Sequence, residues 1–320
     1  MEVGTLIETI SSILAKFAIG LKFLLPSLFL PSLLGIPLDF LLISRYTSLP
    51  SLISSKALFL ISDIAFLACL LANPIICSKV YSSLKPDIVI HAAAVKHIDL
   101  AERQPIHTCR VNLVGSLNII DAAIRNNTPT VIAISTDKAC SSASVYGDTK
   151  SLMEKCFLDA NTNMNRFSVC RFANVAHSNG SVLPFWLKLN SEGKPLKLTD
   201  PNMNRLMFTQ NDAARLISRA IKHTESNGGG FIASYKMKCV NMLDLAKVIS
   251  DDIEIVGKRA GEKTDEDLIS EREISRTFIY DDDIHIKAQK NTEFNKLSKP
   301  YNSASAKKMT KEEMEKLVWG

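Results

Sequence analysis

The sequence lacks the residue patterns that usually hold structural metals or disulfides. Its seven cysteines are scattered without a C-x-x-C pair, whereas zinc sites and disulfide frameworks show paired spacings. Its six histidines show no H-E-x-x-H or similar ligand spacing. We therefore expect no bound metal, and cysteines that stay reduced. A reducing compartment follows, so we predict a cytoplasmic protein, with membrane association as the alternative.

The chain also lacks an apolar run long enough to cross a membrane. The uncharged stretch between Lys22 and Asp39 is interrupted by prolines, and a membrane span needs about 20 apolar residues. A secretory signal is disfavoured because Glu2 and Glu8 occupy a start that is basic in such signals. These features predict no membrane insertion.

Basic runs of the kind that bind nucleic acid are absent too. The 38 Lys and Arg residues are interspersed with 33 acidic ones, which leaves a net charge of +5 over 320 residues. No basic run is interleaved with aromatic residues, so we predict no nucleic-acid partner. With 46% hydrophobic residues, the chain can bury a large core.

From residue 84 onward, predicted strands alternate with predicted helices. Short apolar runs at 88–90, 130–135 and 166–175 predict buried strands, and the segments 107–127 and 144–160 have helical spacing. This alternation favours an α/β fold in which helices cover both faces of a parallel sheet. Further helices are expected near 184–190, at 208–224 behind an Asn/Asp cap, at 240–250 and in the C-terminal tail.

A polar cluster follows one of these strands. Thr136, Asp137 and Lys138 come at the end of the strand at 130–135, and Tyr146 and Lys150 follow in the next helix. Ligands of open parallel sheets bind beyond the carboxyl ends of the strands. Tyr146 and Lys150 are four residues apart and so share one helix face. A free tyrosine has a pKa of about 10, and a neighbouring ammonium moves it toward neutrality, which makes Tyr146 a candidate base.

Eight segments carry a resemblance to a known family: HAAAVKHIDLAE, VNLVGSLNIIDAA, ISTDKA, VYGDTK, RFANV, GSVLPFW, TDPNMNR and GEKTDEDLIS. Over residues 84–285 they resemble the UDP-N-acetylglucosamine 4,6-dehydratases of the polysaccharide biosynthesis family, a group of extended short-chain dehydrogenases. The resemblance implies a Rossmann-like doubly wound domain at 1–175, atypical over 1–80. It further implies a substrate-binding lobe at 176–290 that partly returns to the first domain, and a tail at 291–320.

The resemblance also implies a reaction and a role for each residue of the cluster. Such enzymes oxidise the sugar at C4 with NADP or NAD, eliminate water across C5 and C6, and return the hydride to C6. Tyr146 would be the base for the 4-hydroxyl, with Thr136 bonded to that hydroxyl and Lys150 holding the nicotinamide ribose. Asp137 would protonate the departing 6-hydroxyl, and Lys138 would take the C5 proton. Because a simple epimerase needs neither of these two groups, the Asp-Lys pair favours a dehydratase.

Further positions match family residues that contact cofactor or substrate. The implied cofactor-binding residues are Gly4, Ser44, Arg45, Asp63, Ala92, Ala93 and Asn112, together with Tyr146 and Lys150. The implied residues for the UDP-sugar substrate are Lys96, Asn174, Ser181, Arg205, Arg259 and Glu262. Relatives self-associate, so a homo-oligomer is expected.

The glycine-rich loop that normally cradles the cofactor pyrophosphate is incomplete. Gly4-Thr5-Leu6 matches the middle of such a loop, but no strand precedes it in the sequence and Ile7 stands at the last glycine. Three hypotheses therefore stay open. The chain is a UDP-sugar 4,6-dehydratase, a related UDP-sugar 4- or 5-epimerase, or a non-catalytic remnant that binds a nucleotide sugar or a partner chain.

Overall fold

The computed structural model describes residues 57–60, 73–259, 261–280, 283–288 and 297–320. The first half of the described chain contains five strands with helices and turns between them. In chain order, these elements are β1 (Ala57–Leu60), α3 (Pro74–Leu84), β2 (Ile88–His91), α4 (Ile98–Arg103), α5 (Pro105–Cys109), the π-helical turn η1 (Arg110–Val114), α6 (Gly115–Arg125), β3 (Thr130–Thr136), the 3-10 turn η2 (Asp137–Ala139), α7 (Val145–Asp159), β4 (Arg166–Phe172) and β5 (Asn174–Val175).

The second half of the described chain contains mostly short strands and four α-helices. In chain order, its elements are α8 (Val182–Ser191), β6 (Leu196–Leu198), β7 (Asn204–Phe208), α9 (Gln210–Asn227), β8 (Phe231–Tyr235), β9 (Cys239–Asn241), α10 (Met242–Lys247), β10 (Ile253–Ile255), β11 (Asp267–Ile269), the 3-10 turn η3 (Glu271–Arg276), β12 (Thr277–Tyr280), β13 (Asp283–Lys287), β14 (Tyr301–Asn302) and α11 (Lys311–Trp319). Among the helices of the described ranges, none has both the length and the apolar character needed to cross a membrane.

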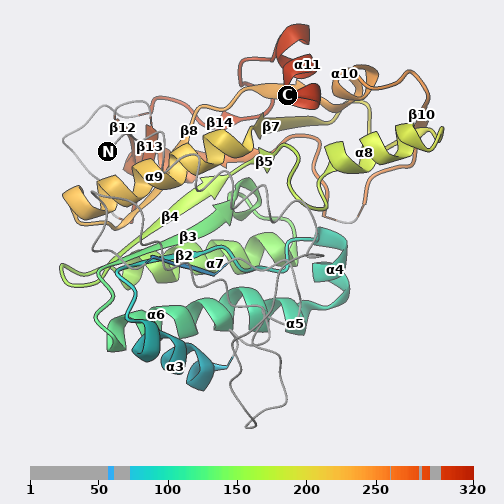
Figure 1. Ribbon diagram of the computed structural model, residues 1–320. Coiled ribbons are helices and arrows are strands. Elements are labelled where there is room, and N and C mark those ends of the chain that lie inside the picture. The colour runs from blue at the N-terminus through green and yellow to red at the C-terminus, as the bar shows by residue number, and fades with distance from the viewer. Residues whose placement is uncertain (1–56, 61–72, 260, 281–282, 289–296) are drawn as a thin grey trace, which may run out of the picture.

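Within the described residues, the central sheet has seven strands in the order β1-β2-β3-β4-β8-β13-β12. The first five pair in parallel, whereas β13 runs antiparallel to both β8 and β12. Helices α3, α6 and α7 lie on one side of the sheet and α9 lies on the other (Figure 1). The predicted α/β fold with a doubly wound parallel sheet is confirmed, and the strand order shows where the C-terminal segment returns to it.

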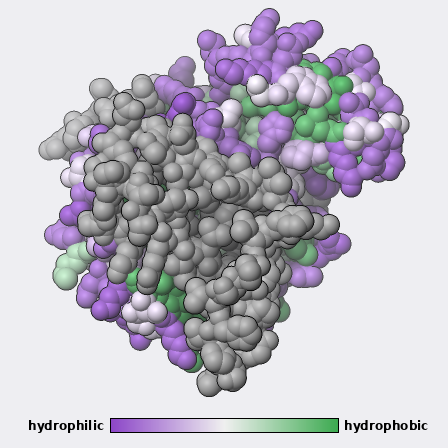
Figure 2. All heavy atoms as spheres, in the orientation of Figure 1, coloured by the Kyte–Doolittle hydropathy of each residue, from purple (hydrophilic) through white to green (hydrophobic). Residues whose placement is uncertain are grey.

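The core has a separate part beneath each layer of helices. Apolar side chains of α6 and α7 pack with the sheet in one cluster, and those of α9 pack with its other face in a second. A third cluster joins α8, α10 and α11 to the short strands β6 and β7. Figure 2 shows this smaller region with apolar atoms among mostly hydrophilic residues. This separate apolar cluster is consistent with a distinct lobe. The boundaries predicted for that lobe, residues 176–290, remain a prediction.

Two elements differ from the expectation. The strand expected at 166–175 ends at Phe172, because Asn174 and Val175 pair with Met207 and Phe208 in another sheet. The expected Asn/Asp cap of α9 is wrong: Thr209 is the N-cap, and its hydroxyl accepts the Asp212 N–H at 3.1 Å. The Asp212 carboxylate in turn accepts the Thr209 N–H at 3.2 Å, which completes a capping box.

Candidate active site

The cluster predicted from the sequence comes together at the carboxyl end of β3. Thr136 ends the strand, and η2 begins at Asp137. Asp137 is fully buried; its Oδ1 accepts the Thr136 hydroxyl at 2.9 Å and forms an ion pair with Lys138 Nζ, also at 2.9 Å. The other oxygen, Oδ2, is buried and has no hydrogen-bond partner among the described residues. Asp137 therefore keeps one acceptor atom that no described residue uses.

Helix α7 starts where it does because two acceptors cap it. The Ser144 side chain accepts the Gly147 N–H at 3.2 Å, and Glu102 accepts the Val145 N–H at 2.7 Å. Tyr146 therefore lies in the first helical turn, buried, and Lys150 follows one turn later. Gly147 allows this turn to approach η2 closely: a Cβ there would lie 2.3 Å from the Lys138 carbonyl oxygen. Both halves of the predicted cluster are thus held against each other.

Lys150 is a buried cation without an oxygen acceptor among the described residues. Within the described part of the chain its Nζ donates a hydrogen bond to Met153 Sδ alone, at 3.2 Å. Burial lowers the pKa of Lys150 to about 8, against the attraction of Glu154. A thioether is a weak acceptor, so most of the hydrogen-bonding capacity of this ammonium is unused. Hydroxyl groups of a ligand would fill that capacity.

His91 is a buried neighbour that the sequence did not identify. Its Nε2 lies 2.9 Å from Ser116 Oγ, and that hydroxyl donates to the Asn112 carbonyl at 2.6 Å. His91 Nε2 is therefore the donor, and Nδ1 is an acceptor that has no partner among the described residues. Burial, followed by the charge of Lys150, lowers the pKa of His91 to about 3, which keeps the ring neutral.

The loop after β2 is braced by Asn112. Its Oδ1 accepts the Val95 N–H at 2.7 Å, and its Nδ2 donates to the Val95 carbonyl and to Thr149 Oγ1, both at 3.1 Å. Ala92 and Ala93 lie between His91 and this brace. Asn112 thereby ties the loop to α7, and its cofactor contact stays a prediction.

A buried ion network fixes α7 from its other side. Arg171 of β4 donates to Glu154 of α7 at 2.9 and 2.6 Å, and to Glu273 of η3 at 2.8 and 3.1 Å. It also donates to the Leu268 carbonyl at 2.8 Å. Burial opposes the ionisation of Glu273, but Arg171 and the added hydrogen bonds outweigh it and lower the pKa of Glu273 to about 2. The network joins α7 to the C-terminal segment.

The residues predicted for the substrate lie in several places. Lys96 donates to the Asn179 carbonyl at 2.5 Å, beside Ser181, the N-cap of α8, whose buried Oγ has no partner among the described residues. Asn174 donates to the Leu206 carbonyl at 3.0 Å. The Arg205 guanidinium donates to three backbone carbonyls, those of Asn204, Lys263 and Thr264. Arg259 and Glu262 form an ion pair at 2.7 Å.

Four predicted cofactor residues lie outside the described residues: Gly4, Ser44, Arg45 and Asp63. The structure does describe β1, which ends at Leu60 and pairs in parallel with β2.

Glu266 is a second group that the sequence did not identify as part of the site. It is buried, burial raises its pKa, and the charges of Lys138 and Asp137 act on it in opposite directions. A second carboxyl group is therefore within electrostatic reach of the Asp137–Lys138 pair. Its position in the matched segment GEKTDEDLIS, four residues after Glu262, is the signal that could have pointed to it.

Comparison with known proteins gives consistent matches. A family model described as polysaccharide biosynthesis protein matches residues 60–288. A UDP-N-acetylglucosamine 4,6-dehydratase (inverting) of Campylobacter jejuni is 39% identical over 202 residues, which are 61% of this chain and 60% of the relative. An uncharacterized membrane protein of Methanocaldococcus jannaschii is 36% identical over 250 residues, 72% of this chain and 74% of that protein.

Among solved structures, the X-ray structure of Pen from Bacillus thuringiensis superposes with a TM-score of 0.71 at 28% identity. The superposition covers 78% of this chain and 79% of that one. The match to the Campylobacter enzyme spans only 60% of its length, so the activity of the whole relative does not transfer by similarity alone.

Proposed function

The chain belongs to the polysaccharide biosynthesis protein family, and we propose that it is a nucleotide-sugar 4,6-dehydratase. The proposed substrate is UDP-N-acetylglucosamine or a similar UDP-hexosamine, and the proposed cofactor is NADP or NAD. The observation that carries the proposal is the direct contact between Asp137 and Lys138 beside Thr136. An acid and a base on neighbouring positions are what water elimination across C5 and C6 requires, and epimerisation at C4 requires neither.

The pair supports elimination because its proton count balances. In the reactive form Asp137 is protonated and Lys138 is neutral. Lys138 takes the proton from C5, and Asp137 gives its proton to the departing 6-hydroxyl, which leaves as water. The pair is then a carboxylate and an ammonium, 2.9 Å apart. As C6 takes up the hydride, Lys138 gives a proton, exchanged with solvent, back to C5. Tyr146 releases the proton of the 4-hydroxyl and Asp137 takes one up, so that all three groups return to the reactive form.

We assign the proton transfer that accompanies oxidation at C4 to side chains of α7. Tyr146 would take the proton of the 4-hydroxyl, and Thr136 would hold that hydroxyl in place. The buried residues around them fit a nicotinamide dinucleotide, because Lys150 Nζ and His91 Nδ1 are polar atoms that no described oxygen or donor satisfies. When bound, the dinucleotide supplies the oxidation at C4 and the reduction at C6. Lys150 would hold its ribose hydroxyls, and the small side chains of Ala92 and Ala93 would allow it to lie close to the backbone.

The remaining contacts are proposed for the nucleotide. Lys96 and Ser181 lie together at the start of α8, with Asn174 on the neighbouring strand β5. Arg259 and Glu262 would exchange their mutual ion pair for the diphosphate and the ribose hydroxyls. Arg205 would act through the loop that it holds, since its donors already serve backbone carbonyls.

The test is incubation of the purified full chain with UDP-N-acetylglucosamine and NADP in deuterated water. A dehydratase gives a product that has lost water and carries deuterium at C5. A product that keeps the 6-hydroxyl and carries no deuterium identifies a 4-epimerase. A product that keeps the 6-hydroxyl and carries deuterium at C5 identifies a 5-epimerase. If native mass spectrometry shows bound cofactor and no product forms, the proposal fails; if neither cofactor nor product is found, the chain is a binding remnant.

Two variants separate the steps. Asp137→Asn keeps the shape and an acceptor for Lys138 but cannot donate a carboxyl proton, and Lys138→Met removes the base. Each should slow water loss by about 10²–10⁴-fold, the usual contribution of one general acid or base, while absorbance still reports cofactor reduction. Lys188→Met, which changes an exposed lysine of α8, is the matched control and should leave turnover unchanged.

A further inference from the structure

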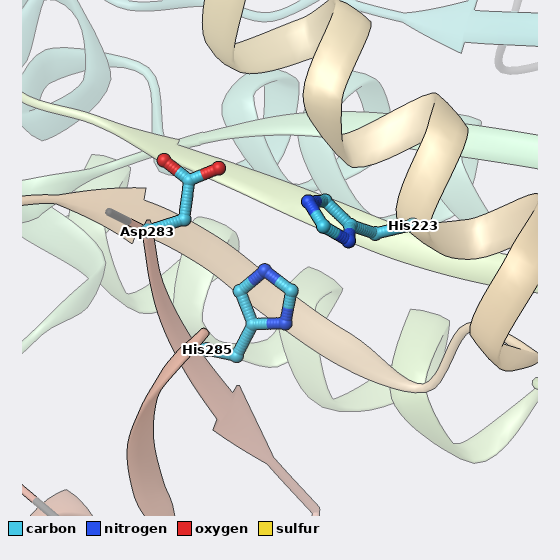
Figure 3. A group of neighbouring side chains, drawn as sticks. All are labelled: His223, Asp283 and His285. Carbon is cyan, nitrogen blue, oxygen red and sulfur yellow. The ribbon is translucent and has the colours of Figure 1, made fainter. Parts of the chain in front are cut away.

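Three side chains of metal-ligand type meet on the face of the sheet that α9 covers. His223 comes from α9, and Asp283 and His285 come from β13 (Figure 3). One ligand atom of each lies within 4.8 Å of the others, and all three residues are buried. We propose that this cluster binds a divalent transition-metal ion, with Zn²⁺ the expected ion. The site is separate from the Asp137–Lys138 pair and independent of the proposed reaction.

The strand geometry explains why the cluster forms. Asp283 and His285 are two residues apart in β13, so their side chains project from the same face of the sheet. That strand is fixed on both sides: His285 lies opposite Ala233 of β8 and opposite Phe278 of β12. His223 approaches from α9 above the same face. The ligands are therefore carried by regular elements that are anchored independently of any ion.

His285 supplies the observation that points to a ligand. Its ring stacks on Phe231, with centroids 4.2 Å apart and planes inclined by 4°, and on Tyr280 at 5.5 Å. Its Nε2 is buried without a hydrogen-bond partner among the described residues, and Figure 3 shows the ring directed toward the other two side chains. His285 Nε2 is therefore a buried donor atom that is available to a metal ion held by the other two side chains.

Two imidazoles and one carboxylate form a ligand set that Zn²⁺ accepts, with water as the fourth ligand. Zn²⁺ bonds of about 2.0–2.2 Å bring tetrahedral ligand atoms to roughly 3.4 Å from one another. The three side chains would therefore close by about 1 Å around the ion. The ion would tie α9 to β13 across the packing between them.

Arg219 is the group that competes with the ion. It lies one turn before His223 on α9, and its Nε and Nη2 each hold one oxygen of Asp283 at 2.7 Å. Its guanidinium occupies the preferred directions of the carboxylate and repels a cation by its charge. The Arg219 side chain is 40% exposed, so the competing group stands at the solvent side of the cluster. Removing its charge should strengthen metal binding.

The experiment is a titration of the purified, chelator-treated full chain with Zn²⁺ against a competing chromogenic chelator, with Co²⁺ spectra as a second readout. One equivalent should bind, without the thiolate absorption that a cysteine site would give. His285→Phe keeps the aromatic stack but loses the nitrogen, and should weaken binding at least about tenfold. Arg219→Gln should tighten it by a similar factor. His107→Gln, which changes a histidine of α5, should have no effect.

Circular dichroism checks that each variant folds, and His223→Gln provides a second ligand deletion should His285→Phe unfold. Substoichiometric binding overturns the proposal. It is also overturned by equal affinity in the wild type and the ligand deletions, or by thiolate absorption with Co²⁺. If Arg219→Gln does not tighten binding, the ion does not use Asp283 and the three-ligand site is wrong.

Discussion

Replacing Gly147 with alanine should disable the reaction centre, because this position has no room for a side chain. The added Cβ would lie 2.3 Å from the Lys138 carbonyl oxygen and 2.4 Å from Ser142 Oγ. The Ser142 hydroxyl can rotate away. The Lys138 carbonyl cannot, since it belongs to the backbone of the η2 turn. The helix must therefore move away from the turn that holds Asp137.

The size of the effect follows from these distances. Relief of the contact needs a displacement of roughly 1 Å, because non-bonded carbon and oxygen atoms settle beyond about 3.3 Å. Alanine gains up to about 1 kcal/mol of helix propensity over glycine, whereas overpacking of this kind costs about 1–3 kcal/mol. With the full gain in helix propensity, the net loss of stability is about 0–2 kcal/mol. A 1 Å shift of Tyr146 relative to Thr136 should cost about 100-fold in turnover.

The assay pairs turnover with urea unfolding. Gly193→Ala is the control, since Gly193 has a φ of +64° and no atom within 4 Å of the added Cβ. Its left-handed backbone should cost about 1–2 kcal/mol without affecting the reaction centre. Equal stability losses with a large difference in turnover support the geometry. If Gly147→Ala keeps wild-type turnover, the close approach of α7 to η2 is not required for the reaction.

Three further predictions concern buried charges. Lys150→Met should abolish turnover yet stabilise the fold at neutral pH by up to about 3 kcal/mol, because the folded pKa of about 8 penalises the ammonium below that pH; in thermal melts the gain should vanish as pH rises toward 10.5. The lowered pKa of Glu273 contributes stability above its unfolded value near 4.5 that is lost as pH falls toward about 2, so acid unfolding should be shallower in Glu273→Gln. Arg171→Met removes the ion pair of Glu154 and leaves Glu273 with its 3.4 Å contact to Arg276, and it should lose about 3–5 kcal/mol in urea unfolding at neutral pH.

The sequence predicted the features that depend on local spacing. The apolar run at 130–135 gave the buried strand β3, and the four-residue spacing of Tyr146 and Lys150 placed them on one face of α7. The approach of these two elements could be expected because side chains at the carboxyl end of a parallel strand meet the start of the next helix. The position of Thr136, Asp137 and Lys138 next to the start of α7 could therefore be predicted from the sequence, and their catalytic roles stay a prediction.

Contacts between segments that are distant in the sequence could not be predicted from local spacing. Arg171 and Glu273 are 102 residues apart, and nothing in the spacing of either predicts their pairing. The cluster of His223, Asp283 and His285 escaped the search for metal-ligand spacing for the same reason. It depends on β13 entering the sheet beside β8, a pairing that charges and apolar periodicity do not specify. The cap of α9 was a smaller error, since Thr209 and Asp212 are both acceptable caps and only the backbone decides between them.

The segment from Gly261 to Glu273 shows how the distant part of the chain packs against the proposed reaction centre. A Cβ on Gly261 would lie 3.2 Å from the Ser144 side chain at the start of α7, and Lys263 donates to the Ser141 carbonyl in the loop before it. Glu266 lies within electrostatic reach of Lys138, and Glu273 holds Arg171. The segment therefore packs along the loop between η2 and α7, so it sets the surroundings of the Asp137–Lys138 pair as directly as β3 does. Catalytic geometry and the stability of this C-terminal segment should consequently be lost together.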